Sequence, residues 1–304
     1  MPKHKPSHYA EYAVLRLLGW ILCILPYYAA LALGCLAAKI SFLLMGRKMA
    51  RAKARVKQVL GPETGEDEAS RIVWVAWRNL VFNGIEMLRA PRVNLRWVNK
   101  YTDYSQFERV LAKLKSGQNV ILALPHMGSW ETAGLSASLL GVPLLFITRQ
   151  QKNVLIGNFI NRIRSRTGQE CVDRDLPLLR IILKKIKEGK VLAILPDIRA
   201  RTDAMQVDFL GGRPMIAAGM ALFARQANVP IYSGCVVRTG WGHHKWIVYD
   251  EIAPDPSLEK TADWHRITQA VMSNFDHLIR EHPGQYFWFN KKWILEPPAE
   301  NETD

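Results

Sequence analysis

Apolar residues form one continuous stretch near the start of the chain and recur in short blocks further along. Residues 17–38 read LLGWILCILPYYAALALGCLAA, which is 22 residues without a charged side chain. As one helix, at about 1.5 Å per residue, this stretch would extend about 33 Å, enough to cross a hydrocarbon core of about 30 Å. Pro26 lies within it and would kink the helix or divide it in two. A single membrane span and a membrane-embedded helical hairpin therefore both fit, and a buried soluble helix is the competing interpretation.

From about residue 105 onward, short apolar blocks alternate with segments of helical periodicity. Strands are predicted at 119–125, 142–148, 191–197 and 229–237, with 245–252 pairing beside the last of these. Helical patterns are found at 66–90, 107–117, 129–140, 153–167, 175–188, 215–227 and 261–283. Short apolar strands that alternate with helices indicate an α/β fold, layered around a mostly parallel central sheet.

These patterns divide the chain into three parts. Residues 1–46 are expected to form an N-terminal hydrophobic membrane anchor, either a helix or a hairpin, and residues 47–295 an α/β domain. Residues 296–304, EPPAENETD, are acidic and contain proline, so we expect a disordered tail. With 49% hydrophobic and 22% charged residues, the chain as a whole is neither disordered nor fibrous.

The net charge of +14 is concentrated at the N-terminal end. Residues 1–60 hold ten basic side chains and one acidic side chain, and six of the basic ones lie in RKMARAKARVK, at 47–57. This basic run follows the apolar stretch, so it would be attracted to anionic headgroups and would place the remaining chain in the cytoplasm. A solvated helix face is the competing interpretation of the run. A nucleic-acid-binding fold would spread its basic charge over a folded face, so no nucleic-acid partner is expected.

Cysteine and histidine spacing give no sign of a disulfide framework or a metal site. The four cysteines contain no C-x-x-C pair, which favours a reducing compartment. His243 and His244 are adjacent and would point to opposite faces of a strand, so we expect no metal site there. The chain also lacks a G-x-S-x-G motif, which argues against a hydrolase with a nucleophile elbow.

The most informative stretch is LALPHMGSWE, at residues 122–131, where a predicted strand ends and a helix begins. His126 follows the strand, and ligands bind at the carboxyl ends of strands in open α/β sheets. Glu131, five residues later, is expected to accept a hydrogen bond from one imidazole nitrogen and leave the other free as a base. A histidine that merely caps the turn is the competing interpretation. Asp197 ends a second buried strand at the same edge and is expected to orient a group of the site.

The chain resembles the bacterial lipid A late acyltransferases of the lauroyl/myristoyl type, within the H-x4-D/E glycerolipid acyltransferase superfamily. His126-x4-Glu131 carries this resemblance together with further blocks in the family order: INRIRSRTG (160–168), EGKVLAILPD (188–197), DFLGGRPM (208–215), ANVPI (227–231) and HPGQYFWFNKKW (282–293). The chain departs from the family pattern at Ile198, at the extra glycine of the third block and at Asn290, where histidine is usual.

The resemblance implies a membrane-bound O-acyltransferase of lipid A and lipopolysaccharide biosynthesis. By this resemblance, the enzyme is expected to act on the cytoplasmic face of the bacterial inner membrane. It is expected to transfer an acyl chain from acyl carrier protein or coenzyme A to a hydroxyl of a lipid A precursor. It is expected to need no other cofactor and no metal. Its expected partners are membrane lipids, acyl carrier protein and a glycolipid acceptor, and it is expected to be a monomer. A different acceptor, such as a lysophospholipid or another glycolipid, is the alternative, followed by an inactive membrane-binding module.

The resemblance also implies roles for individual residues. His126 is the general base and Glu131 its orienting partner. Arg164 is expected to bind an acceptor phosphate, and Arg166 or Arg162 could be the true match to the family's arginine. Asp197 belongs to the substrate-binding residues, and Arg213 to the acceptor pocket.

Overall fold

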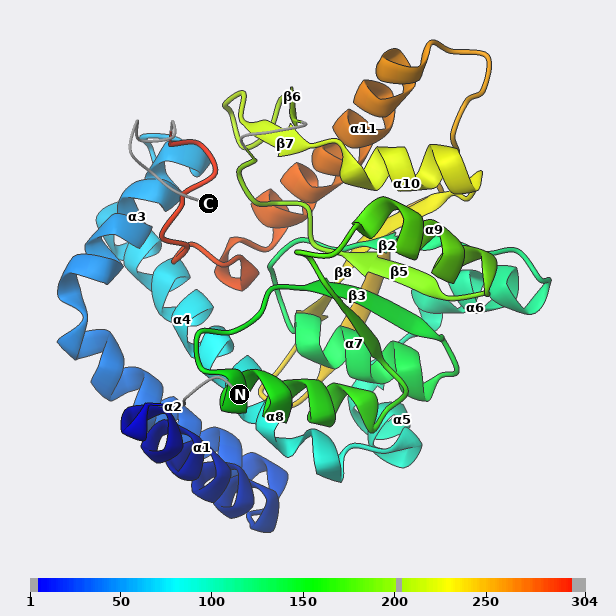
Figure 1. Cartoon of the computed structure of the whole chain (residues 1–304). Coiled ribbons are helices and arrows are strands. Elements are labelled where there is room, and N and C mark those ends of the chain that lie inside the picture. Colours follow the sequence, from blue (N-terminus) through cyan, green and yellow to red (C-terminus); the bar gives the residue numbers. More distant parts are fainter. Residues whose placement is uncertain (1–4, 201–203, 297–304) are drawn as a thin grey trace.

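Two helices separated at Pro26 begin the structure, a computed structural model that describes residues 5–200 and 204–296 (Figure 1). Pro26 thus divides the apolar stretch, which is one of the two predicted outcomes. Four helices form this N-terminal part: α1 (Pro6–Ile24), α2 (Tyr27–Leu44), α3 (Gly46–Leu60) and α4 (Glu66–Arg89). Apart from Glu296, the expected disordered tail lies outside the described residues.

A seven-stranded sheet with the order β1-β9-β8-β2-β5-β3-β4 forms the centre of the α/β domain. All neighbouring strands are parallel except β8 and β9, so the predicted mostly parallel α/β fold is confirmed. The strands are β1 (Thr102–Asp103), β2 (Ile121–Ala123), β3 (Leu144–Thr148), β4 (Glu170–Asp173), β5 (Val191–Ile194), β8 (Ile231–Arg238) and β9 (His244–Val248). A separate antiparallel pair consists of β6 (Ala204–Gln206) and β7 (Met215–Ala217).

Helices cover both faces of this sheet (Figure 1). The helices of the α/β domain are α5 (Leu95–Tyr101), α6 (Glu108–Lys115), α7 (Trp130–Leu139), α8 (Val154–Ser165), α9 (Leu178–Lys187), α10 (Gly219–Ala227) and α11 (Lys260–Glu281). Short 3-10 helices lie at Ala90–Arg92, Ser105–Phe107 and Pro283–Gln285.

Four short strands were not predicted from the sequence pattern. Strand β4 lies in the segment between two predicted helices, and residues 215–217 form β7 rather than the start of the predicted helix at 215–227. β4 has the sequence ECVD and lies at the sheet edge, so it carries too few apolar residues for the alternating signal of a half-buried strand. The other two are β1, which has only two residues and lies at the opposite sheet edge, and β6, which pairs with β7 outside the main sheet.

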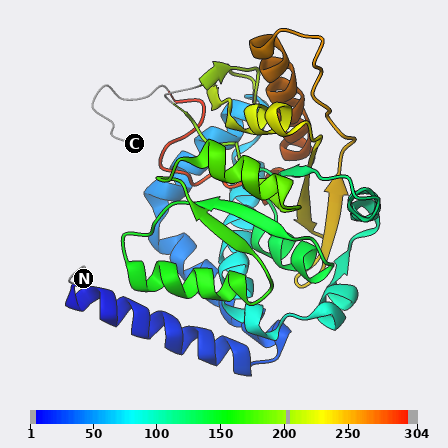
Figure 2. The same ribbon diagram turned by 45° about the vertical axis from the view of Figure 1, so that its right-hand side comes forward.

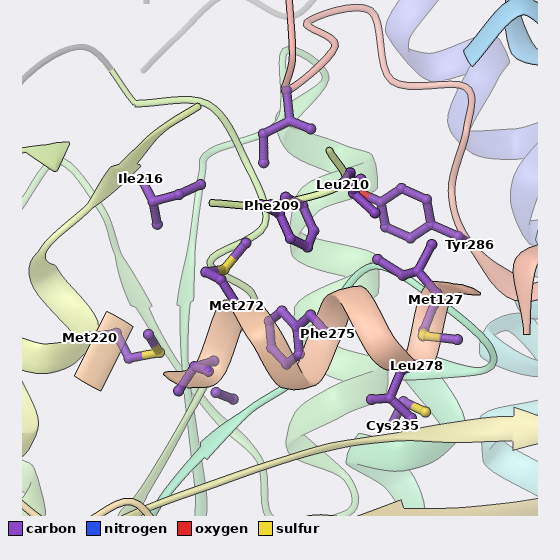
Figure 3. Packing of buried hydrophobic residues seen from close by; sticks show 14 of the residues in the cluster. Met127, Phe209, Leu210, Ile216, Met220, Cys235, Met272, Phe275, Leu278 and Tyr286 are labelled. Carbon is purple, nitrogen blue, oxygen red and sulfur yellow. The ribbon is translucent and has the colours of Figure 1, made fainter. Parts of the chain in front are cut away.

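Alternate residues of the central strands enter two different cores. Ile121 and Ala123 of β2 pack into the larger core, whereas Leu122 faces the smaller core on the opposite side. Figure 3 shows the larger core, in which Phe275 and Leu278 of α11 lie among side chains of distant segments. Both faces of β2 are therefore buried, and its carboxyl end is held at a fixed position.

Helix α4 lies between α1 and α2 on one side and the α/β domain on the other. Helix α2 packs along it: a Cβ built on Gly34 would come within 2.1 Å of Ile85 on α4. Tyr27, Leu31, Phe82 and Ile85 belong to the small hydrophobic cluster that joins the two helices. Figure 2 shows α1 running beneath α8 on the same side of the molecule.

Beneath this contact, the carboxylate of Glu86 and the guanidinium of Arg238 form a buried ion pair. Their two parallel contacts measure 2.7 and 2.8 Å, and both side chains are 2% exposed. The same carboxylate accepts hydrogen bonds from Tyr27 at 2.6 Å, Ser129 at 2.8 Å and Thr132 at 3.2 Å. Burial disfavours the charged carboxylate, but the Arg238 charge and the nearby His244 hold the pKa of Glu86 well below its ordinary range.

We expect Glu86→Ala to lower the free energy of unfolding by about 3–5 kcal/mol, because it leaves the buried charge of Arg238 without a partner. The double variant Glu86→Leu/Arg238→Met should lose clearly less, since no lone charge remains. Glu68→Ala, which removes an exposed carboxylate of the same helix, is the control and should change stability little. Urea unfolding followed by tryptophan fluorescence measures all three, and equal effects of Glu86→Ala and Glu68→Ala would contradict the structural role.

Candidate active site

His126 lies in a tight turn between the carboxyl end of β2 and the start of α7. Gly128 makes this turn with a φ of +58°, and a Cβ there would come within 2.0 Å of the Val236 carbonyl oxygen. The next residue, Ser129, donates its backbone N–H to that same carbonyl at 2.8 Å. The amide of Asn83 on α4 donates to the Gly128 carbonyl at 2.7 Å. Glycine is therefore required at position 128, and the turn is held from two sides.

The hydrogen-bond partner of the His126 ring is Asp197. Nδ1 of the ring lies 2.7 Å from Oδ1 of Asp197, and the backbone N–H of His126 donates to Oδ2 at 2.8 Å. Asp197 follows β5, which pairs with β2, so the two residues meet at the carboxyl edge of the sheet. A carboxylate can only accept, so Nδ1 carries the proton and Nε2 is left with its lone pair. Among the described residues, Nε2 has no hydrogen-bond partner.

The prediction that Glu131 holds the His126 ring is therefore wrong in this structure. Glu131 lies in the first turn of α7 and pairs with Arg164 of α8, with contacts of 2.6 Å from Nη2 and 3.4 Å from Nε. Both side chains are largely buried, so the guanidinium is the partner that compensates the Glu131 charge. Among the described residues, the ion-pair partner of Asp197 is His126 rather than an arginine.

The surroundings of His126 raise its pKa. Burial of the ring favours the neutral form and works against this shift, but the charge of Asp197, its hydrogen bond and the charge of Glu131 together outweigh burial. Arg164 shows the same balance: burial lowers its pKa, the Glu131 carboxylate raises it, and the net shift is upward. Glu131 thus acts on His126 through its charge rather than through a hydrogen bond.

The segment after α11 closes over the turn of His126. Phe287 donates its backbone N–H to the His126 carbonyl at 2.9 Å, and Gly128 donates to the Gln285 carbonyl at 2.8 Å. A cavity of about 10 Å³ beside the ring is lined by His126, Asp197 and residues of this segment. Burial and the neighbouring Asp197 carboxylate raise the pKa of the Tyr286 hydroxyl well above its ordinary range.

A larger cavity of about 550 Å³ lies beside the Glu131–Arg164 pair, at the carboxyl ends of β3 and β4. Most of its lining is polar: Glu131, Thr148, Arg149, Gln150, Gln151, Asn158, Asn161, Arg164 and Asp173. Such a lining fits a ligand rich in hydroxyl or phosphate groups better than an acyl chain. In the described part of the chain, no three His, Cys, Asp or Glu side chains come together as metal ligands.

Two of the predicted substrate-binding arginines lie away from these groups. Arg166 is exposed at the end of α8 and does not line the larger cavity, whereas Arg164 does. Arg213 is 69% exposed and lies 3.4 Å from Asp208. It lines a different cavity of about 340 Å³, whose wall includes Ile294, a residue that also lines the small cavity beside His126.

Sequence reasoning missed the residues that hold the terminal segment in place. Arg55 is buried on α3 and donates to the carbonyls of Trp288 at 2.8 Å and Asn290 at 2.7 Å. In the sequence, Arg55 is one of six basic residues in a run that suggests contact with lipid headgroups. The apolar residues around it, Ala52 and Val56, were the available signal that this one arginine faces inward.

With this geometry established, comparison with known proteins identifies the class. The family model of the bacterial lipid A biosynthesis acyltransferases matches residues 3–294, and the chain belongs to this family. It is therefore an enzyme that transfers acyl groups. The predicted family is thus confirmed, whereas the roles of individual site residues stay predictions.

Curated relatives are similar over about two thirds of the chain. The phosphatidylinositol mannoside acyltransferase of Mycolicibacterium smegmatis is 23% identical, covering 69% of this chain and 68% of the relative. That of Mycobacterium tuberculosis is 25% identical over 69% and 66%. A lipid A biosynthesis acyltransferase of Haemophilus influenzae is 21% identical over 63% and 58%. The 1-acyl-sn-glycerophosphate acyltransferase PlsC of Thermotoga maritima superposes with a TM-score of 0.39 at 12% identity, covering 79% of this chain and 97% of PlsC.

The partner assignment can be tested on the His126 ring itself. We expect an NMR titration of labelled histidine to give His126 a pKa above the ordinary value of 6.5. Asp197→Asn should lower it, because burial then acts without the main opposing charge, and Glu131→Gln should lower it less. The exposed His265 on α11 serves as the internal control. If Glu131→Gln changes the pKa of His126 more than Asp197→Asn does, Glu131 and not Asp197 is the main partner of the ring.

Proposed function

We propose that the enzyme transfers a fatty acyl chain from an acyl thioester to a hydroxyl of a glycolipid, with His126 as the general base. The observation that carries this proposal is the His126–Asp197 pair, with 2.7 Å between Nδ1 and the carboxylate and with Nε2 unengaged among the described residues. A positioned base of this kind is what removal of a hydroxyl proton requires.

In the proposed reaction, Nε2 of His126 takes the proton of the acceptor hydroxyl as its oxygen attacks the thioester carbonyl carbon. The tetrahedral intermediate collapses, the carbon–sulfur bond breaks, and the departing sulfur receives the proton from Nε2. Asp197 stabilises the imidazolium between these two transfers, which agrees with the raised pKa of His126. The thioester supplies the activated acyl group, so the reaction requires no resident cofactor.

We further propose that the 550 Å³ cavity receives the polar headgroup of the acceptor. Its polar lining supports a hydroxyl-rich or phosphorylated group, and it adjoins Glu131, whose charge reaches the His126 ring. Arg164 remains the proposed phosphate-binding residue, now acting as part of an ion pair with Glu131. Arg166 and Arg213 would contact only parts of the substrates that lie outside this cavity.

The donor is proposed to be acyl carrier protein or coenzyme A, and the site of action the cytoplasmic face of the inner membrane. One described helix, α2, is long and apolar enough to cross a membrane, with a mean hydropathy of 1.7. The basic helix α3 follows it directly, and its charge suits either anionic lipid or an acidic carrier protein. We propose that the enzyme works there as a monomer.

Two acceptors fit the relatives, and lipid analysis distinguishes them. We expect mass spectrometry of a deletion strain to show loss of one secondary acyl chain from lipid A, which identifies a lipid A precursor as the acceptor. If lipid A is unchanged and a mannosylated phosphatidylinositol loses a chain, the second candidate is correct. If no glycolipid changes, a glycolipid acceptor is excluded and lysophospholipid has to be tested.

We expect His126→Ala to lower the rate of acyl transfer by about 10²–10⁴-fold, because the base is lost. Asp197→Asn should also slow transfer and move the acidic limb of the pH–rate profile to lower pH, since His126 then deprotonates at lower pH. His265→Ala, an exposed histidine on α11, is the control and should leave the rate unchanged. Transfer from a radiolabelled acyl thioester measures this, and near-normal turnover of His126→Ala would refute the assignment.

A further inference from the structure

Exposed apolar side chains gather on the first two helices. Of the 21 large hydrophobic side chains that are exposed in the described residues, 14 lie between residues 9 and 45. They are Tyr9, Val14, Leu17, Leu18, Trp20, Ile21, Ile24, Tyr28, Leu33, Leu36, Ile40, Leu43, Leu44 and Met45. Apolar surface concentrated in this way marks a contact with a membrane or a partner.

The opposite face of α2 is already covered by protein from Tyr27 to Ala38. Ala30, Leu31, Gly34 and Ala38 are buried at helical spacing, and small residues among them bring α2 close to α4. A helix that crossed the bilayer in this position would carry α4 with it, including the charged side chains of that helix. Separation of the two helices would instead expose Phe82 and Ile85 and remove the hydrogen bond between Tyr27 and Glu86.

Both ends of α2 are attached to the α/β domain. At its first turn, the Tyr27 ring lies 5.5 Å from Trp97 of α5, and the Tyr28 hydroxyl lies 3.2 Å from Nε2 of His243. Near its last turn, Ser41 accepts a hydrogen bond at 3.0 Å from the indole N–H of Trp77 on α4, whose ring packs against Phe289 of the α/β domain with 5.1 Å between the ring centroids. A spanning helix would have the domain at one end only.

Exposed basic residues border both ends of α2 as well. Arg92, Arg96 and Lys100 are exposed on and before α5, whose Trp97 packs against Tyr27 at the start of α2. Arg47 and Arg51 are exposed on α3 at the other end. The positive-inside rule gives a spanning helix basic residues at its cytoplasmic end only. Basic groups at both ends of an apolar helix face fit a helix that lies in the plane of an anionic surface.

We propose that α1 and α2 lie side-on in a single leaflet of an anionic membrane and that neither helix spans it. Their outward apolar faces enter the headgroup–acyl boundary, while α4 holds them against the α/β domain. This inference rests on the membrane location under the proposed function, but not on the reaction.

The arrangement would bring the polar cavity next to the lipid surface. Helix α8, whose residues Val154, Gly157 and Asn158 line that cavity, is held against α1. Asn153 donates to the His8 carbonyl at 3.0 Å and to the Glu11 carboxylate at 2.8 Å. An acceptor lipid could then keep its acyl chains in the leaflet while its headgroup enters the cavity.

Cysteine labelling distinguishes the topologies without any activity measurement. Single cysteines would be placed at the exposed positions Ser7, Pro26 and Ala50 in full-length protein whose four native cysteines are replaced by alanine. A membrane-impermeant maleimide should label all three in inside-out vesicles and none in intact spheroplasts. Labelling of Ser7→Cys and Pro26→Cys from outside would indicate a single span, and labelling of Pro26→Cys alone a spanning hairpin. Either result would overturn the proposal.

Vesicle flotation tests the anionic surface and the basic residues at both ends of α2. On phosphatidylglycerol-containing vesicles, Arg92→Glu/Arg96→Glu and Arg47→Glu/Arg51→Glu should each weaken binding by at least about tenfold. The matched control is Arg180→Glu/Lys187→Glu, which should bind normally. These two exposed residues lie on α9, on the side of the sheet away from α1 (Figure 1). Unchanged binding of both arginine double variants would contradict the proposal. A stable dimer in lipid nanodiscs whose interface covers the apolar face of α1 and α2 would also contradict it, because a second copy of the chain and not lipid would then cover that face.

Discussion

The buried pair of Glu86 and Arg238 connects the turn of His126 with strand β8 and the first turn of α2. Each charge is almost completely removed from water, so neither can lose the other without a large loss of stability. Glu86 also accepts hydrogen bonds from Ser129, at the start of α7, and from Tyr27, at the start of α2. One carboxylate therefore fixes the turn of His126, the sheet and the N-terminal helices relative to each other.

This arrangement explains how three carboxylates near the turn take different roles. Glu86 is paired with Arg238 and Glu131 with Arg164, so arginine compensates both of these charges. Asp197 has only His126 as its ion-pair partner among the described residues. The carboxylate that lacks an arginine is the one that can support a histidine whose charge changes during a reaction.

The sequence predicted the edge of the sheet at which the site forms, but not all of its pairings. Buried strands before His126 and Asp197 were visible as apolar blocks, and parallel strands bring their carboxyl ends to one edge. The short spacing between His126 and Glu131 suggested a pair, because nothing in the local pattern shows that Arg164 returns to Glu131 from another helix. Arg55 was hidden for a similar reason, since its partners lie more than 230 residues away along the chain. Long-range contacts between polar groups leave no periodic signal in a sequence.

In the proposed mechanism His126 and Asp197 act as one unit, which a double-mutant cycle can measure. The rate of acyl transfer would be compared for His126→Ala, Asp197→Asn and the double variant. If Asp197 acts through the imidazole, the double variant should be about as slow as His126→Ala alone, because nothing is left for Asp197 to orient. If instead the two single effects multiply in the double variant, the two residues act independently, and Asp197 does not act through His126.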